Sequence, residues 1–350
     1  MKLYGKNWTR RELEARVGRL EQIGGIRRFK LMEGTEAEVE LIQVRTGSGL
    51  TYYVSPLRCL DISLAEFCGV PISWQASTGD IHPAYYRAEG MEWLRTAVGG
   101  LLMTCGLRQV GSPNEDQGES LGLHGRIHHT PARQVTAQGI WIGDEYEIVI
   151  SGIIEETRIF GEYLRLSREI QGRLGENTIA IHDKVENLGF EPSPLMVLYH
   201  FNFGFPLMSE TTQISFPSRR VVPREQETPL QGYEEWQVPA IGYRERVYYH
   251  EDLITSPDHK GWATAIVRNP EFPLPSGGGC DLSVILRWST EHLPRLVQWK
   301  MPGAGVHVLG IEPANCYVQG RANERQRGTL VSIEPGQALH YELNLEISVK

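Results

Sequence analysis

The chain has 350 residues, of which 41% are hydrophobic, and a formal net charge of -8. This length and composition allow a large buried core and predict a globular protein. The sequence has no run or stripe of Lys and Arg, so we expect neither nucleic acid nor an anionic membrane surface as a partner. It also has no apolar run of about 18 residues, so we expect no membrane-spanning helix.

The five cysteines are scattered and form no CxxC pair, which disfavours a zinc knuckle. Buried free thiols in a reducing compartment are the simplest interpretation. The N-terminal segment is polar and charged, and it lacks the apolar stretch and cleavage site of a signal peptide. We therefore expect a cytoplasmic protein.

Residues 9–20 carry the one convincing helical pattern. Thr9 and Glu12 have the spacing of a capping box, and Gly24 and Gly25 end the pattern. From there the chain changes to short runs with a period of two, which is typical of half-buried strands. These runs lie at residues 38–44, 145–151, 164–170, 178–185 and 343–347. Many short strands separated by Gly and Pro turns predict an all-β sandwich or barrel.

The first candidate site residue is His124, in the sequence Leu-His-Gly-Arg. Adjacent glycines permit tight backbone geometry and the close approach of a ligand. Arg126 would place a guanidinium near the imidazole if both lie on one strand face. A surface hairpin is the alternative. A metal site formed by His124, His128 and His129 is a second alternative, although no carboxylate or cysteine lies nearby in the sequence to complete it.

The second candidate is His200, in an apolar and aromatic run over residues 198–206. In a strand, His200 and Asn202 face one way, and the aromatic residues at 199, 201, 203 and 205 face the other. A strand buried on its aromatic side would present His200 and Asn202 to a cleft. The alternative is a core histidine satisfied by a backbone partner.

The third candidate is Glu312, which follows the apolar run 306–311. Burial of a carboxylate is costly and raises its pKa towards the range of a general base. Trp299 offers an aromatic platform for a sugar ring, and Lys300 offers an ammonium group for hydroxyls. An ordinary glutamate at the end of a strand is the alternative interpretation.

Two imidazoles and a carboxylate suffice for general acid–base chemistry without a metal or a cofactor. We expect neither a metal nor a cofactor, because the chain lacks the zinc-binding HExxH motif and the glycine-rich loops that bind nucleotides. It also lacks the GxSxG motif of serine hydrolases. A further cluster, Arg58 and Asp61, predicts an ion pair, with ligand contacts as the alternative.

In order and spacing these segments resemble the aldose 1-epimerase (galactose mutarotase) superfamily, and in particular its aldose-epimerase-like branch. The resemblance covers most of the chain. It rests on residues 58–62, 99–107, LHGR at 123–126, LYHFNFGFP at 198–206 and GIEPAN at 310–315. It implies an all-β, galactose-mutarotase-like β-sandwich of large twisted antiparallel sheets with a short N-terminal helix. We expect residues 1–25 to form a helical extension and residues 26–350 a single sandwich domain.

The resemblance also implies interconversion of the α and β anomers of a free sugar. It implies that Glu312 takes the proton of the anomeric hydroxyl, that His200 protonates the ring oxygen, and that His124 orients the same region. The substrate-binding residues it implies, with those of the neighbouring clusters, are Arg126, Asn202, Lys300, Arg58, Asp61 and Trp299.

In well-studied mutarotases the first motif reads LHGG, so Arg126 would favour an acidic or phosphorylated sugar. Their additional sugar-binding aspartate has no clear counterpart here. The alternatives are a carbohydrate-binding module without catalysis, or another isomerase or lyase reaction with the same residues. Exposed sheet edges make a homodimer a reasonable expectation.

Overall fold

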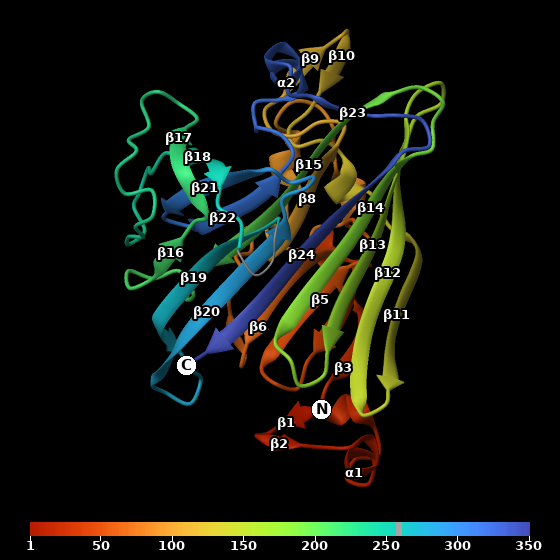
Figure 1. The fold of residues 1–350 in the computed structure, drawn as a ribbon, viewed down its shortest axis with the longest axis vertical. Helices are drawn as coiled ribbons and strands as arrows, with labels where there is room; N and C mark the ends of the chain where they lie inside the picture. Colours follow the sequence, from red (N-terminus) through yellow and green to blue (C-terminus); the bar gives the residue numbers. More distant parts are fainter. Residues whose placement is uncertain (257–260) are drawn as a thin grey trace.

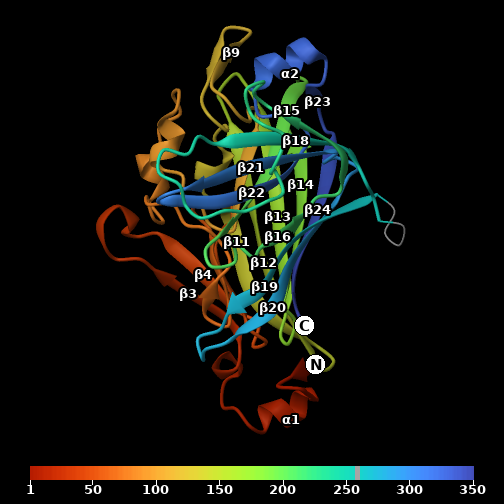
Figure 2. The same cartoon turned by 90° about the vertical axis from the view of Figure 1, so that its left-hand side faces the viewer.

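A computed structural model describes residues 1–256 and 261–350, in which two large antiparallel sheets pack face to face (Figures 1 and 2). This architecture confirms the predicted all-β sandwich. Four of the five predicted runs lie within strands, and burial alternates with a period of two along them, as along β12 (Glu145–Thr157). The run 38–44 begins before its strand, which starts at Glu40. None of the helices described is long and apolar enough to cross a membrane.

The larger sheet has twelve strands and carries the candidate site residues His200 and Glu312. Its main path runs through β17 (Ser218–Pro223), β18 (Arg246–Leu253), β21 (Arg295–Gly303), β22 (Val306–Ala314), β15 (Ser193–Gly204), β8 (Leu102–Leu107), β6 (Asp61–Phe67), β5 (Leu50–Ser55), β4 (Glu40–Arg45) and β3 (Gly25–Lys30). Two short strands extend it, because β7 (Val70–Pro71) pairs with β6 and β23 (Val331–Ile333) pairs with β15.

The smaller sheet has eight strands, and it lies in front of the larger one in Figure 1. Its order is β11 (Arg133–Ile142), β12, β13 (Tyr163–Arg173), β14 (Thr178–Asn187), β24 (Ala338–Val349), β20 (Gly279–Ser289), β19 (Trp262–Pro273) and β16 (Gln213–Ser215). The C-terminal strand therefore completes the middle of this sheet.

Two small structures lie at opposite ends of the sandwich (Figure 1). At one end β1 (Lys2–Leu3) and β2 (Lys6–Asn7) pair next to α1 (Arg10–Glu14). At the other end β9 (Asn114–Asp116) and β10 (Glu119–Leu121) pair beside α2 (Arg321–Arg327). Short 3-10 turns lie at Leu20–Gln22, Gly34–Glu36, Pro83–Tyr85, Glu92–Arg95 and Ile127–His129.

The N-terminal helix is shorter than predicted. The capping box of Thr9 and Glu12 is present, but α1 ends at Glu14 rather than at residue 20. Only Leu13 of its five residues is buried, and a short helix needs packing of an apolar face to persist. Val17 and Gly18, which follow, are also weak helix formers.

The main core lies between the two sheets. Both sheets contribute alternate apolar side chains to it, among them Tyr52, Ile62, Leu102, Tyr199, Phe201 and Leu309 from the larger sheet and Ile150, Leu166, Ile181, Leu286 and Leu343 from the smaller one. A second apolar cluster covers the outer face of the larger sheet, where Trp93 and Leu123 pack over Met103, Leu198 and Val297. The candidate site lies beside this second cluster.

Candidate active site

β15 presents its two faces to different environments. Tyr199, Phe201 and Phe203 are buried in the core between the sheets. His200 points the opposite way and lines a cavity on the outer face of the larger sheet. Phe205 does not follow the predicted aromatic face, because β15 ends at Gly204 and the Phe205 side chain is 73% exposed.

His200 and Glu312 lie side by side on neighbouring strands. The register of β15 and β22 pairs Leu198 with Ala314 and Asn202 with Gly310, which places His200 opposite Glu312. Nε2 of His200 is 3.2 Å from Oε1 of Glu312. Both residues are buried, so an acid and a base share the floor of one cavity.

Gly310 provides the space for this pair. A Cβ at position 310 would lie 2.6 Å from Oε1 of Glu312 and 3.1 Å from Cε1 of His200. Both distances are shorter than ordinary contacts, so a side chain here would displace the two functional groups.

Burial moves the pKa of both groups towards their neutral forms. It lowers the pKa of His200 to about 3, and the neighbouring His124 lowers it further, whereas Asn202 opposes the shift. Burial likewise raises the pKa of Glu312 well above its ordinary value, assisted by the negative charge of Glu245. Both shifts favour a protonated Glu312 carboxyl beside a neutral His200.

His124 approaches the pair from a strained turn. Its φ of 54° lies in the left-handed region, which is uncommon for a residue with a side chain and recurs at functional sites. Its backbone N–H donates to the carbonyl of Gly111, and its carbonyl accepts from Gly106. The imidazole lies with its centre 6.1 Å from that of His200, and burial lowers its pKa to about 4.

The hydrogen bond to the His124 ring fixes its tautomer. The backbone N–H of Gly111 donates to Nδ1 of His124 at 3.4 Å. Nδ1 must therefore be the unprotonated nitrogen, and the neutral ring carries its proton on Nε2. His124 is thus a hydrogen-bond donor rather than a base.

The cavity around these groups has a volume of about 260 Å³. Tryptophans form much of its wall: Trp74, Trp93 and Trp299 all line it. The rings of Trp74 and Trp299 meet edge to face at 6.0 Å, and that of Trp93 lies 5.0 Å from His124. Nε1 of Trp93 is buried without a hydrogen-bond partner among the residues described, so a bound ligand could accept from it.

Two charged residues that the sequence did not single out also line the cavity. Arg224 and Glu245 form an ion pair at 2.9 Å, and Glu245 accepts a hydrogen bond from Nε1 of Trp299. Arg224 also contacts Glu225. Both residues flank β strands in a stretch rich in charges, and no sequence pattern distinguishes them from their neighbours.

Asn202 supports the site without lining the cavity. It is fully buried, and its amide donates to the carbonyls of Gly100 and His200. It therefore holds the backbone of β15 where His200 is attached.

Four other predicted substrate-binding residues are not brought to the cavity. Arg126 is exposed and lines a separate depression. Lys300 points to the opposite side of β21 from Trp299, and its ammonium donates to the carbonyls of Gly232 and Glu235. Arg58 donates to the carbonyl of Ile81.

Asp61 is the fourth, and it accepts from Thr104, Arg168 and His128 within the buried core. Among the ion pairs that the described residues form, none joins Asp61 to Arg58, because Arg168 and His128 occupy its carboxylate instead. The predicted pairing of Arg58 and Asp61 is thus wrong.

The fold resembles that of several solved structures. A candidate aldose 1-epimerase from Klebsiella pneumoniae aligns with 92% of this chain and 83% of its own, with a TM-score of 0.81 and 23% identity. A galactose mutarotase-like protein from Clostridium acetobutylicum aligns over 94% and 100%, with a TM-score of 0.58 and 14% identity. A galactose 1-epimerase from Lactobacillus acidophilus aligns over 93% and 98%, with a TM-score of 0.58 and 9% identity.

These likenesses confirm the predicted galactose-mutarotase-like fold and, at such low identities, the fold alone. A comparison with curated proteins finds no match. A family model does match, over residues 36–347, which is most of the sandwich. The chain belongs to the family DUF4432, described as a domain of unknown function.

Proposed function

We propose that this protein is an aldose 1-epimerase that interconverts the α and β anomers of a free sugar. The observation that carries the proposal is the pairing of His200 with Glu312 at 3.2 Å on the floor of a cavity. An acid and a base so close together can act on two oxygens attached to one carbon. The galactose-mutarotase-like fold supports the same reaction class.

In the proposed reaction, the proton held by the Glu312 carboxyl moves to His200 when the sugar binds, which makes His200 the acid and the Glu312 carboxylate the base. The Glu312 carboxylate then removes the proton of the anomeric hydroxyl, and the C1–O bond to the ring oxygen breaks as C1 becomes an aldehyde. His200 protonates the departing ring oxygen. After rotation about C1–C2 the ring closes on the other face of the carbonyl, and the two protons return by the reverse transfers.

His124 is proposed to donate from Nε2–H to the oxygen on which negative charge develops. Its lowered pKa keeps it neutral near pH 7, and a neutral imidazole with a fixed tautomer donates without competing for the transferred proton. The three tryptophans would pack on the sugar ring and exclude water.

The cavity favours an uncharged sugar. Arg126, which the sequence suggested as an anion-binding residue, lies outside the cavity. Arg224 lies within it, but Glu225 and Glu245 already balance its charge. We therefore expect faster epimerisation of neutral aldoses than of their phosphorylated or acidic counterparts.

The test is saturation-transfer NMR of anomer exchange over a panel of neutral, acidic and phosphorylated aldoses. The wild-type protein should accelerate exchange for at least one sugar, and Glu312→Gln should lower that rate by on the order of 10²–10⁴-fold. The proposal fails if no sugar exchanges above the uncatalysed rate. A rate that Glu312→Gln leaves unchanged would rule out Glu312 as the base.

A carbohydrate-binding module is the second candidate, and the three cavity tryptophans favour it. Such a module would bind a sugar with little dependence on Glu312. Calorimetric titration of wild type and Glu312→Gln with the same panel separates the two: binding without exchange in either protein would identify a module.

A further inference from the structure

Gln109 lies directly behind the turn that carries His124. Its side chain is almost fully buried, at 2% exposed, and it does not line the cavity. Nε2 donates to the carbonyls of Gly111 at 3.2 Å and Ser112 at 2.8 Å. Oε1 accepts from the backbone N–H of Arg321 and from Nδ2 of Asn114.

All four hydrogen bonds of the Gln109 amide are made, and they leave only one orientation of the group. The backbone N–H of Arg321 is a donor, so it must face the amide oxygen. The carbonyls of Gly111 and Ser112 are acceptors, so they must face the amide nitrogen. A buried polar group satisfied in this way fixes the segments around it.

The segment that Gln109 holds is the one that contacts the His124 ring. Gly111 accepts a backbone hydrogen bond from His124 and donates one to its Nδ1. Gly111 cannot be replaced easily, because its φ is 80° and a Cβ there would lie 2.0 Å from the carbonyl oxygen of Val318.

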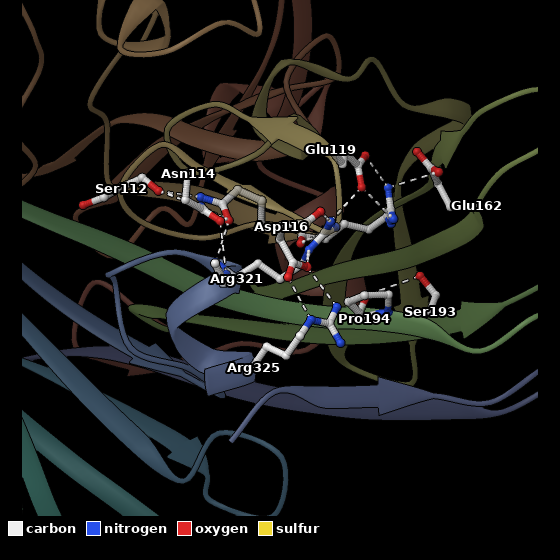
Figure 3. Close-up of polar contacts among 12 residues, drawn as sticks. Ser112, Asn114, Asp116, Glu119, Glu162, Ser193, Pro194, Arg321 and Arg325 are labelled. Carbon is white, nitrogen blue, oxygen red and sulfur yellow. Dashed lines mark hydrogen bonds and ion pairs between the residues drawn. The ribbon is translucent and has the colours of Figure 1, made fainter. Parts of the chain in front are cut away.

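The other side of Gln109 is anchored by ion pairs at the end of the sandwich. Figure 3 shows Arg321 and Arg325 of α2 meeting Asp116 of β9. The two ion pairs have lengths of 2.6 Å and 2.8 Å. Arg321 also pairs with Glu119 at 2.7 Å. The backbone N–H that donates to Gln109 therefore belongs to Arg321, whose side chain pairs with two carboxylates.

From these contacts we infer that Gln109 is a positioning residue for His124. It holds the carbonyls of Gly111 and Ser112 so that the Gly111 N–H stays on Nδ1 of His124 and the Nε2–H faces the cavity. This role rests on the proposed function in one respect, which is that His124 contacts a sugar. The geometry of the His124 ring can be measured without any sugar.

The experiment is a two-bond ¹H–¹⁵N correlation spectrum of ¹⁵N-histidine protein, with His124 assigned from a His124→Gln variant. In the wild type we expect the proton on Nε2 and an Nδ1 resonance shifted by its hydrogen bond. In Gln109→Met, which keeps the volume but loses the amide, the Nδ1 resonance should lose that shift. In the same variant kcat should fall about tenfold while KM stays within about twofold.

Arg325→Gln is the matched control. It removes one ion pair to Asp116 but leaves every hydrogen bond of Gln109 in place, so its His124 spectrum should match the wild type. Asn114→Ala is the milder variant, and it should shift the Nδ1 resonance in the same direction as Gln109→Met. It keeps the test usable if Gln109→Met does not fold.

Two results would overturn the inference: a wild-type His124 protonated on Nδ1, or folded Gln109→Met and Asn114→Ala variants with an unaltered His124 spectrum. Failure of the proposed function looks different. No sugar would then be epimerised, yet the His124 spectrum would still depend on Gln109.

Discussion

The buried Glu312 carboxyl is expected to lower the free energy of unfolding of the protein. Burial raises the pKa of its carboxyl above the ordinary value of 4.5. The folded protein therefore holds this proton to higher pH than the unfolded chain does. It follows that the group weakens the fold increasingly as pH rises above about 4.5, up to the raised pKa in the folded state.

Glu312→Gln should therefore be more stable than wild type at neutral pH. The difference in the free energy of unfolding should grow by up to about 1.4 kcal/mol per pH unit above pH 4.5. Urea denaturation of both proteins from pH 4 to pH 8 measures it. The exposed Glu334→Gln is the control and should differ from wild type by no more than about 0.5 kcal/mol. A difference that shrinks with rising pH would contradict the assignment of a raised pKa.

At the scale of the element, side chains alternate between the two faces of a strand, and this alternation explains what the sequence could predict about the site. Alternation along residues 198–204 was enough to separate the buried aromatic face of β15 from the face of His200. The same rule applies to Trp299 and Lys300, because successive residues of a strand cannot face the same side. It could have shown that Lys300 points away from Trp299.

Strand pairing is what the sequence could not supply. His200 and Glu312 are 112 residues apart, and their contact depends on β15 and β22 being neighbours in the correct register. A shift of one residue would turn one of them to the other face. Arg224 and Glu245 could not be predicted for a related reason: they reach the cavity only because β17 and β18 form the edge of the sheet next to β21.

That edge leads to a prediction about specificity. Glu245→Gln would keep an acceptor for the Trp299 N–H but remove the charge that balances Arg224 in the cavity. We expect the ratio of kcat/KM for an acidic aldose to that for its neutral counterpart to rise about fivefold, which corresponds to about 1 kcal/mol.

The measurement is the same exchange assay with paired sugars. Glu251→Gln is the control, because Glu251 pairs with Arg220 on the same two strands and does not line the cavity. The ratio should not change in that variant. An unchanged ratio in Glu245→Gln would mean that the Arg224 charge does not act on the sugar.

At the scale of the whole molecule, a buried polar network joins the two sheets beneath the site. Arg168 of β13 pairs with Asp183 of β14 at 2.6 Å and with Asp61 of β6 at 2.7 Å. Tyr199 of β15 donates to Asp183 at 2.7 Å. Since Tyr199 precedes His200, the inner face of β15 is fixed to the opposite sheet one residue before the proposed acid.

Arg168 is therefore expected to be essential for stability. Its side chain is fully buried, and replacing it with Met would leave two carboxylates buried without their main partner. Such a loss typically costs about 3–5 kcal/mol. Arg165 on the same strand is the matched control, because its pair with Glu155 is partly exposed and is worth about 1 kcal/mol or less. Urea denaturation should show a much larger loss for Arg168→Met than for Arg165→Met, and equal losses would mean that the network does not hold the sheets together.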